Sequence, residues 1–190
     1  MVPERIAFVE EMRQLRAEDL VAVDETAITT DMVRTHARSA PGERAHGSAP
    51  QGRWKKLTLL GGIALGREPV LMSIEASTDT DVFLAFVRKV LVPSLRPGQI
   101  VLMDNLSPHK APAVREAIEA AGCRLRLLPR YSPDLNPIEM CWSKIKALLR
   151  KVAARTVEAL NAALAEVLDS VALQDIRGWF SHCGYKVAPQ

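Results

Sequence analysis

The chain has 190 residues, of which 48% are hydrophobic and 25% are charged. These fractions are typical of a globular protein and exclude disordered and collagen-like classes. The length suits one domain with a buried core. No apolar stretch approaches the roughly 20 residues of a transmembrane helix, and the N-terminus lacks the apolar centre of a signal peptide. We therefore expect a cytoplasmic protein without a membrane partner.

The charge is unevenly distributed, although 25 basic and 22 acidic residues give a net charge of only +3. Residues 1–31 are mainly acidic, whereas residues 32–56 and 122–155 are both strongly basic. Two separated basic stretches favour a polyanionic partner such as nucleic acid. A solvated basic surface without a partner would give the same pattern, so charge alone leaves both interpretations open.

Hydrophobic patterning predicts blocks of strands and helices. Short β-branched or alternating runs indicate strands, and apolar residues at helical spacing indicate helices. The predicted strands are residues 20–23, 54–64, 70–74, 99–103 and 123–128. The predicted helices are residues 3–15, 78–91, 114–121, 138–152, 156–171 and a last one around 176–180. After the first helix, the order is βββαβαβα.

Local signals predict how several of these elements end. The first strand should end at Asp24, whose side chain would then reach water. Pro93 and Pro97 should end the helix 78–91, and Asn136 followed by a proline should cap the helix 138–152. Residues 36–53 are rich in proline and glycine and predict a long loop, which in a compact domain is usually functional or mobile.

Three carboxylates fall at the ends of predicted elements: Asp24 after the first strand, Asp104 after the fourth, and Glu139 at the start of the helix 138–152. Oxygen ligands of this kind suit a hard cation such as Mg²⁺. Each acid also has a structural interpretation. Glu139 occupies the capping-box position relative to Asn136, and Asp104 could belong to a turn. Asp24 is the hardest to explain structurally, because Glu25 doubles the charge beside a buried strand.

Two further features bear on this candidate site. His109 could be a surface residue or a group that supports a metal ligand, and the sequence does not decide between them. Glu139, Lys146 and Arg150 share one face of the predicted helix, together with Ser143. A basic track on this face would bind phosphates regardless of base sequence.

The motifs that contain these acids resemble those of a known family. They are Asp24-Glu25-Thr26, Asp104-Asn105 with His109, the segment Leu128–Glu139 and the closing segment Trp179–Tyr185. The sequence resembles the DDE transposases of bacterial insertion sequences, most closely the mariner-related insertion sequence 630 family. The 34 residues from 105 to 138 between the second and third acids match the spacing in this family. The proline-rich segment before Glu139 makes the resemblance specific.

The resemblance implies an α/β fold of the RNase H-like type, a mixed five-stranded sheet flanked by helices. It implies that Asp24, Asp104 and Glu139 are catalytic and bind two Mg²⁺ ions, for which Mn²⁺ can substitute. The activity would be cleavage of DNA at the element ends, followed by attack of the freed 3′-hydroxyl on target DNA, typically at a TA dinucleotide. We expect Asn105, His109 and Asn136 to contact the metal ligands rather than the metal.

The resemblance also implies partners. DNA is expected as element ends and as target, with a homodimer acting on paired ends in the bacterial cytoplasm, associated with the nucleoid when bound. The residues expected to bind DNA are Arg53, Lys55, Lys56, Arg130, Lys144, Lys146 and Arg150. Arg130 stands where the family usually has proline.

The expected domain organisation is a lead-in helix and linker at residues 1–19 and the catalytic domain at residues 20–190. The N-terminal helix-turn-helix region of full-length family members is expected to be absent, and translational frameshifting could supply it from an upstream frame. A truncated remnant is an alternative. The rival functions are a non-catalytic DNA-binding or dimerising fragment that regulates transposition, and an RNase H-like nuclease.

Overall fold

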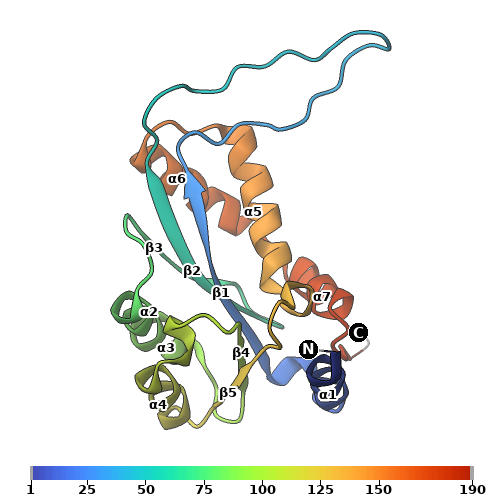
Figure 1. Cartoon of the computed structure of the whole chain (residues 1–190), viewed down its shortest axis with the longest axis vertical. Helices are drawn as coiled ribbons and strands as arrows, with labels where there is room; N and C mark the ends of the chain where they lie inside the picture. The colour runs from blue at the N-terminus through green and yellow to red at the C-terminus, as the bar shows by residue number, and fades with distance from the viewer. Residues whose placement is uncertain (1, 189–190) are drawn as a thin grey trace.

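The computed structural model describes residues 2–188, which form a five-stranded sheet with helices on both faces (Figure 1). The strands are β1 (Leu20–Thr29), β2 (Lys56–Ala64), β3 (Val70–Ile74), β4 (Ile100–Met103) and β5 (Arg124–Leu127). Their order in the sheet is β3-β2-β1-β4-β5. The pairs β1–β2 and β2–β3 are antiparallel, whereas β1–β4 and β4–β5 are parallel. The sheet is therefore mixed, and the predicted fold class is confirmed.

The helices occupy the two faces in separate groups. They are α1 (Val2–Arg13), α2 (Thr80–Phe86), α3 (Val92–Ser94), α4 (Pro112–Ala120), α5 (Ile138–Val152), α6 (Val157–Asp169) and α7 (Leu173–His182), with short turns at η1 (Ala17–Asp19), η3 (Pro108–Lys110) and η4 (Pro133–Leu135). One buried core joins the sheet to α1, α5, α6 and α7. A second core joins the other face to α2 and α4.

Strand β1 contributes to both cores, since successive side chains of a strand point to opposite faces. Ala22 and Ile28 belong to the core under α5, whereas Val21 and Val23 belong to the core under α2. The same alternation places Asp24 and Glu25 on opposite faces of the sheet. These two adjacent acids therefore meet different surroundings.

The first strand is longer than predicted. Its parallel pairing with β4 stops at Ala22, but its antiparallel pairing with β2 continues to Thr29. Asp24 consequently lies inside the strand, opposite Gly61 of β2, and the prediction that it ends the strand was wrong. The β-branched run shows where the strand is buried, but the antiparallel partner decides where it ends.

The next helical run extends slightly beyond the predicted residues 78–91 and ends at Ser94, between Pro93 and Pro97. It starts after the N-cap Asp79, whose carboxylate accepts a hydrogen bond from the Val82 N–H at 2.9 Å. A π-helical segment, η2 (Val87–Leu91), then precedes α3, which includes Pro93. The wider π-helical turn changes the local backbone hydrogen bonding and accommodates Pro93, and the run ends one residue later.

The predicted long loop is confirmed. Residues 34–56 are exposed, and the segment between β1 and β2 projects beyond the sheet (Figure 1). The base of this segment is held by Arg155, whose guanidinium donates hydrogen bonds to the carbonyl groups of Thr30 and Met32, both at 3.0 Å. Among the described residues, no helix is long and apolar enough to cross a membrane.

Helix α1 packs beside β5 and the segment before α5. Phe8 and Met12 are buried in the core. Arg5 pairs with Asp134, and Glu11 pairs with Arg126 at 2.5 Å. The lead-in helix is therefore attached to the chain segment that forms one wall of the candidate site.

Candidate active site

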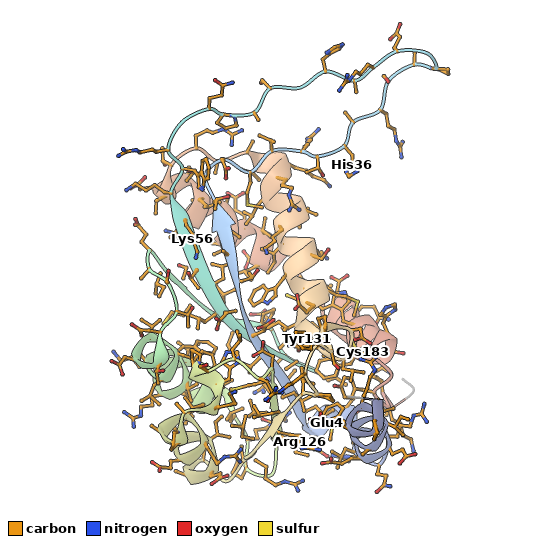
Figure 2. All side chains as sticks on the ribbon, in the orientation of Figure 1. Glu4, His36, Lys56, Arg126, Tyr131 and Cys183 are labelled. Carbon is orange, nitrogen blue, oxygen red and sulfur yellow. The ribbon has the colours of Figure 1, made fainter. Side chains whose placement is uncertain are left out.

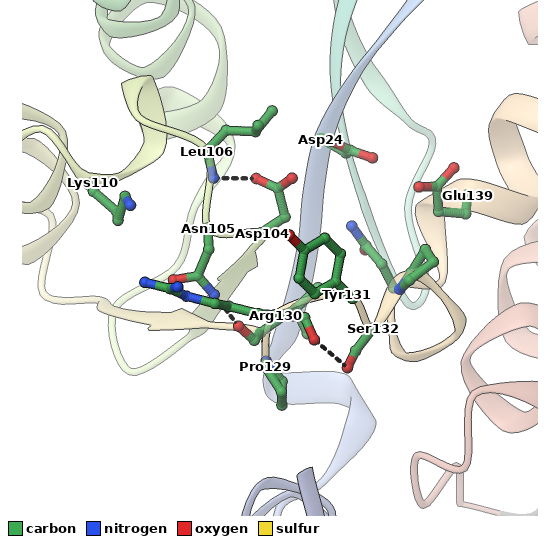
Figure 3. Close-up of a pocket in the computed structure, with 13 residues that line it drawn as sticks. Asp24, Asp104, Asn105, Leu106, Lys110, Pro129, Arg130, Tyr131, Ser132 and Glu139 are labelled. Carbon is green, nitrogen blue, oxygen red and sulfur yellow. Dashed lines mark hydrogen bonds between the residues drawn. The ribbon is translucent and has the colours of Figure 1, made fainter. Parts of the chain in front are cut away.

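The three predicted acids line one cavity of about 460 Å³ at the carboxyl end of β4. Figure 3 shows Asp104 and Glu139 on opposite sides of Asp24, with Arg130, Tyr131 and Ser132 along one edge. The acids come from three separate elements, namely the middle of β1, the loop after β4 and the first turn of α5. The fold thus brings together residues that are far apart in the sequence.

Asp24 is the most buried of the three acids, with 7% of its surface exposed. Burial, together with the negative charges of Glu139 and Asp104, raises the pKa of its carboxyl group to about 7, against a backbone hydrogen bond from Glu25 and the charge of His109, which lower it. The expectation that this side chain reaches water at a strand end was wrong. A buried carboxylate that two other acids repel is stabilised by a cation.

Asp104 is held by two hydrogen bonds. Its Oδ1 accepts one from the Leu106 N–H at 3.0 Å and a shorter one from His109 Nδ1 at 2.5 Å. Burial raises the pKa of Asp104, but these hydrogen bonds and the charge of His109 outweigh burial and lower it overall. Asp104 is therefore ionised near neutral pH and has a fixed orientation.

His109 lies beneath Asp104 and is fully buried, which excludes the alternative of a surface histidine. Its Nε2 lies 3.1 Å from the Glu25 carboxylate, and its ring packs on Phe83 of α2 with 4.2 Å between centroids. Burial lowers the pKa of His109, but the hydrogen bonds to Asp104 and Glu25 raise it to about 9. The protonated ring donates to both carboxylates.

Glu139 differs from the other two acids because its side chain is exposed. Burial of part of the carboxyl group and the charge of Asp104 raise its pKa, whereas Lys146 lowers it. Its capping-box interpretation is not supported, since Asn136 Oδ1 is buried without a hydrogen-bond partner and no side chain caps α5. The prediction that Asn136 caps this helix was wrong.

Two asparagines line the same cavity. The side chain of Asn105 donates a hydrogen bond to the Leu128 carbonyl and joins the loop after β4 to the segment after β5. Asn136 is 2% exposed. Of the three residues expected to contact the acids, only His109 makes such a hydrogen bond.

The predicted basic residues fall into three groups. Arg130 lines the cavity, and Lys146 lies close enough to Glu139 and Asp24 for their charges to affect its pKa. Lys144 instead pairs with Asp175 at 2.5 Å, so its charge is already neutralised. Lys56 lies near the loop end of the sheet in Figure 2, five residues along the β1–β2 ladder from Asp24, or about 17 Å.

Three further residues belong to this site and were not among those predicted from the sequence. Glu25 was noted only for its charge, although the alternation of β1 places its side chain on the face opposite Asp24, where it contacts His109. Lys110 and Tyr131 both line the cavity. Tyr131 has a left-handed backbone (φ 55°) and is 89% exposed. Nothing in its residue type signals this conformation, whereas Lys110 lies next to His109 and could have been included.

The sequence model of the DDE superfamily endonuclease family matches residues 19–161, a range that contains all three acids. The chain belongs to this family. DDE enzymes use divalent metals, and the acids of this cavity are ligands of the kind that Mg²⁺ and Mn²⁺ prefer. A comparison with curated proteins found no match.

Solved structures of the Mos1 transposase share the fold of this DDE endonuclease. The Mos1 strand transfer complex matches with a TM-score of 0.67 and 20% identity over 95% of this chain and 55% of the Mos1 chain. The Mos1 mariner paired end complex with Mn matches with a TM-score of 0.64 and 20% identity over 95% and 58%. The Mos1 catalytic domain with raltegravir and Mg matches with a TM-score of 0.60 and 17% identity over 95% and 88%. The chain therefore spans just over half of the Mos1 chain in the complexes and most of the catalytic domain.

The donor chemistry of the cavity fits a divalent cation. Asp24 and Asp104 offer carboxylate oxygens, and the raised pKa of Asp24 reflects burial first and then repulsion by Glu139 and Asp104, both of which a cation would offset. Within residues 2–188, no three His, Cys, Asp or Glu side chains lie close enough together to hold a metal ion as they stand. Two protein carboxylates with several water ligands are sufficient for Mg²⁺, and the acids would have to move closer together for all three to bind one ion.

Proposed function

We propose that this DDE endonuclease is the catalytic domain of an insertion-sequence transposase related to the insertion sequence 630 family. The observation that carries the proposal is the cavity that Asp24, Asp104 and Glu139 line together from three elements of the sheet and helices. The match to the DDE family over residues 19–161 supports the assignment. The reaction would be cleavage of DNA strands at the element ends, followed by transfer of the freed 3′-hydroxyl to target DNA at a TA dinucleotide.

Asp24 and Asp104 would be the principal metal ligands, and Glu139 would complete a second metal site. When bound, two Mg²⁺ ions, or Mn²⁺ as a substitute, supply Lewis acidity that stabilises the attacking and leaving oxygens of phosphoryl transfer. The protein itself supplies orientation. The bond from the Leu106 N–H holds one oxygen of Asp104, and the burial of Asp24 keeps its carboxyl group inside the cavity.

The DNA would lie across the cavity and along α5. Arg130 and Lys110 line the cavity, and Lys146 and Arg150 continue from Glu139 along one face of α5. From Glu139 to Arg150 the helix rises about 16 Å, toward the loop base that Arg155 holds. Arg53 and Lys55 of the projecting loop and Lys56 at the start of β2 would then contact DNA further from the cavity. Such contacts give affinity without sequence specificity.

The remaining expectations complete this proposal. The protein would act as a homodimer on paired element ends in the bacterial cytoplasm, associated with the nucleoid through DNA. A helix-turn-helix region, supplied by frameshift fusion with an upstream frame, would recognise the terminal repeats. These expectations are supported by the fold that the catalytic part shares with the Mos1 strand transfer and paired end complexes.

The first test is crystallographic. Crystals soaked in Mn²⁺ should show an anomalous peak that at least two of the three acids bind, and crystals of Asp104→Ala should lack it. A wild-type protein without a peak, with the acids still separated, would contradict a catalytic metal site and favour a domain that only binds DNA.

A second test measures Mn²⁺-dependent nicking of supercoiled plasmid. We expect activity in wild type and in the control Glu119→Gln, whose carboxylate is exposed on α4. Activity that survives in Asp104→Ala would disprove the assignment of the acids. Cleavage restricted to RNA–DNA hybrids would favour an RNase H-like nuclease.

A further inference from the structure

Glu25 follows Asp24 on β1 but points to the opposite face of the sheet. There it contacts His109, which in turn contacts Asp104. We propose that Glu25 and His109 form a bridge that fixes the position of Asp104 relative to Asp24 and thereby sets the affinity of the site for a divalent cation. The inference rests on the proposed function, because it assigns the two aspartates as ligands. It makes His109 and Glu25 positioning residues that do not touch the cation.

The connection is short and continuous. Asp24 and Glu25 are adjacent on β1, and their side chains point to opposite faces of the sheet. Glu25 Oε2 lies 3.1 Å from His109 Nε2, and His109 Nδ1 lies 2.5 Å from Asp104 Oδ1. One strand residue and one imidazole ring therefore link the two aspartates through the protein interior.

The ring in this link has little freedom to move. His109 has no exposed surface and packs on the ring of Phe83, which is itself fully buried in the core under α2. The short turn η3, which carries His109, follows the loop that begins at Asp104. Core packing thus fixes the imidazole, and the imidazole fixes one oxygen of Asp104.

Asp104 needs such a contact more than Asp24 does. Asp24 lies within a paired strand and is 7% exposed, so its backbone and side chain are already constrained. Asp104 follows the last residue of β4, and 40% of its side chain is exposed. Without His109, its carboxylate could adopt other rotamers toward solvent, and a cation would have to order it on binding. Groups that orient metal ligands in this way typically change metal affinity roughly 10- to 100-fold when they are removed.

The bridge could instead serve only to hold α2 and η3 against the sheet. The two roles differ in which hydrogen bond matters. A purely structural link needs both bonds, since it must span Glu25 and Asp104. A positioning role needs the bond from the ring to Asp104 above all, with Glu25 as a secondary support that aligns the ring.

Two substitutions separate these bonds. In His109→Asn, the side-chain amide can take the place of Nδ1 and still donate to Asp104, but it cannot reach Glu25. In His109→Gln, the amide can take the place of Nε2 and still donate to Glu25, but not to Asp104. Glu25→Ala removes the carboxylate that contacts His109 Nε2 and leaves the contact between His109 and Asp104 in place. Glu116→Gln is the matched control, because its carboxylate is exposed on α4.

The measurement is Mn²⁺ binding to the purified full chain by isothermal titration calorimetry, with the melting temperature of the metal-free variants recorded alongside. We expect the dissociation constant to rise roughly 10- to 100-fold in His109→Gln, less in Glu25→Ala and least in His109→Asn, and to stay unchanged in Glu116→Gln. Equal effects in the Asn and Gln variants, or affinities that follow only the melting temperatures, would overturn the positioning role.

The proposed function and the bridge fail in distinguishable ways. A wild-type protein that binds no Mn²⁺ would contradict the metal site itself. Wild-type binding that Asp104→Ala abolishes, together with unchanged binding in every His109 and Glu25 variant, would contradict the bridge alone. Crystals of His109→Gln give a readout that needs no metal. An Asp104 carboxylate that keeps its wild-type position there would overturn the bridge, and a displaced one would support it.

Discussion

The two sides of the cavity are built differently. On one side, Asp104 is tied to the Leu106 N–H and to a fully buried histidine, which in turn contacts Glu25. On the other side, Glu139 is exposed on the first turn of α5, without the capping box that its sequence suggested. Contacts within the core therefore position the Asp104 side, whereas the Glu139 side depends on where α5 lies.

The position of α5 has its own supports. Trp142 packs against Gly61, the residue paired with Asp24 on β2. The Tyr185 hydroxyl donates a hydrogen bond to the Leu135 carbonyl at 2.6 Å and holds the segment that precedes α5. The backbone of Glu139 is thus positioned by contacts that do not involve its carboxylate. Its side chain therefore keeps the freedom to approach a cation.

The largest expected difference between the two sides is in metal binding. Asp104→Asn should abolish measurable Mn²⁺ binding, because it removes the charge of the ligand that the protein holds in place. Glu139→Gln should retain one binding event of reduced affinity, since Asp24 and Asp104 remain. Isothermal titration calorimetry measures both. Equal loss in the two variants would show that the exposed side is as necessary for the first ion as the fixed side.

A pH dependence tests the buried acid between the two sides. The pKa of Asp24 is about 7 in the folded chain, against 3.8 for an ordinary aspartate. Because the folded pKa is raised, the stability linked to this carboxyl group is complete below the unfolded pKa and is lost as the pH rises through 7. The loss of unfolding free energy is at most about 4 kcal/mol. Urea unfolding of the metal-free protein should therefore show Asp24→Asn gaining stability over wild type from pH 4 to pH 8. Asp81→Asn, an exposed acid on α2, should run parallel to wild type. Parallel curves for Asp24→Asn would show that this carboxyl group is hydrated.

The packing that places α5 can be disturbed at one atom. A Cβ on Gly61 would lie 2.6 Å from a ring carbon of Trp142, so Gly61→Ala forces the ring to shift. Overpacking of this kind costs about 1–3 kcal/mol of unfolding free energy. Gly47→Ala is the matched control, because no atom lies within 4 Å of its Cβ. Urea denaturation with equal midpoints for the two variants would contradict the role of this contact.

These differences also show what the sequence could predict. The succession of strands and helices along the chain and the long loop follow from hydrophobic patterning, and motif spacing singled out three acids that line one cavity; these are local signals. The extent of β1 depends on its antiparallel partner β2, which the pattern of residues 20–23 does not contain. The burial of Asp24 was missed for the same reason.

The bridge through His109 illustrates a second limit. Its residue type and position made it a candidate, but only the packing of α2 against the sheet decides that the ring is buried and faces Glu25. The same holds for Lys144, which belongs to the basic stretch 122–155 and was expected to bind DNA, whereas α7 provides Asp175 as its partner. Contacts between elements distant in sequence decide which of several chemically suitable residues are left without an ion-pair partner and can bind a ligand.

The difference between Lys146 and Lys144 on α5 gives the smallest predicted effect, a change in the salt dependence of DNA binding. Burial and Arg150 lower the pKa of Lys146, and Glu139 and Asp24 raise it, so this ammonium lies in the field of the proposed site. Lys146→Ala should reduce the slope of log affinity against log salt for duplex DNA by about 0.9, the value for one phosphate contact. Lys144→Ala should leave the slope unchanged, because Asp175 neutralises its charge, and should lower stability by at most about 1 kcal/mol. Fluorescence anisotropy with a labelled duplex at several salt concentrations measures both. A reduced slope in Lys144→Ala would mean that DNA displaces Asp175 and that the basic face of α5 is wider than the free chain shows.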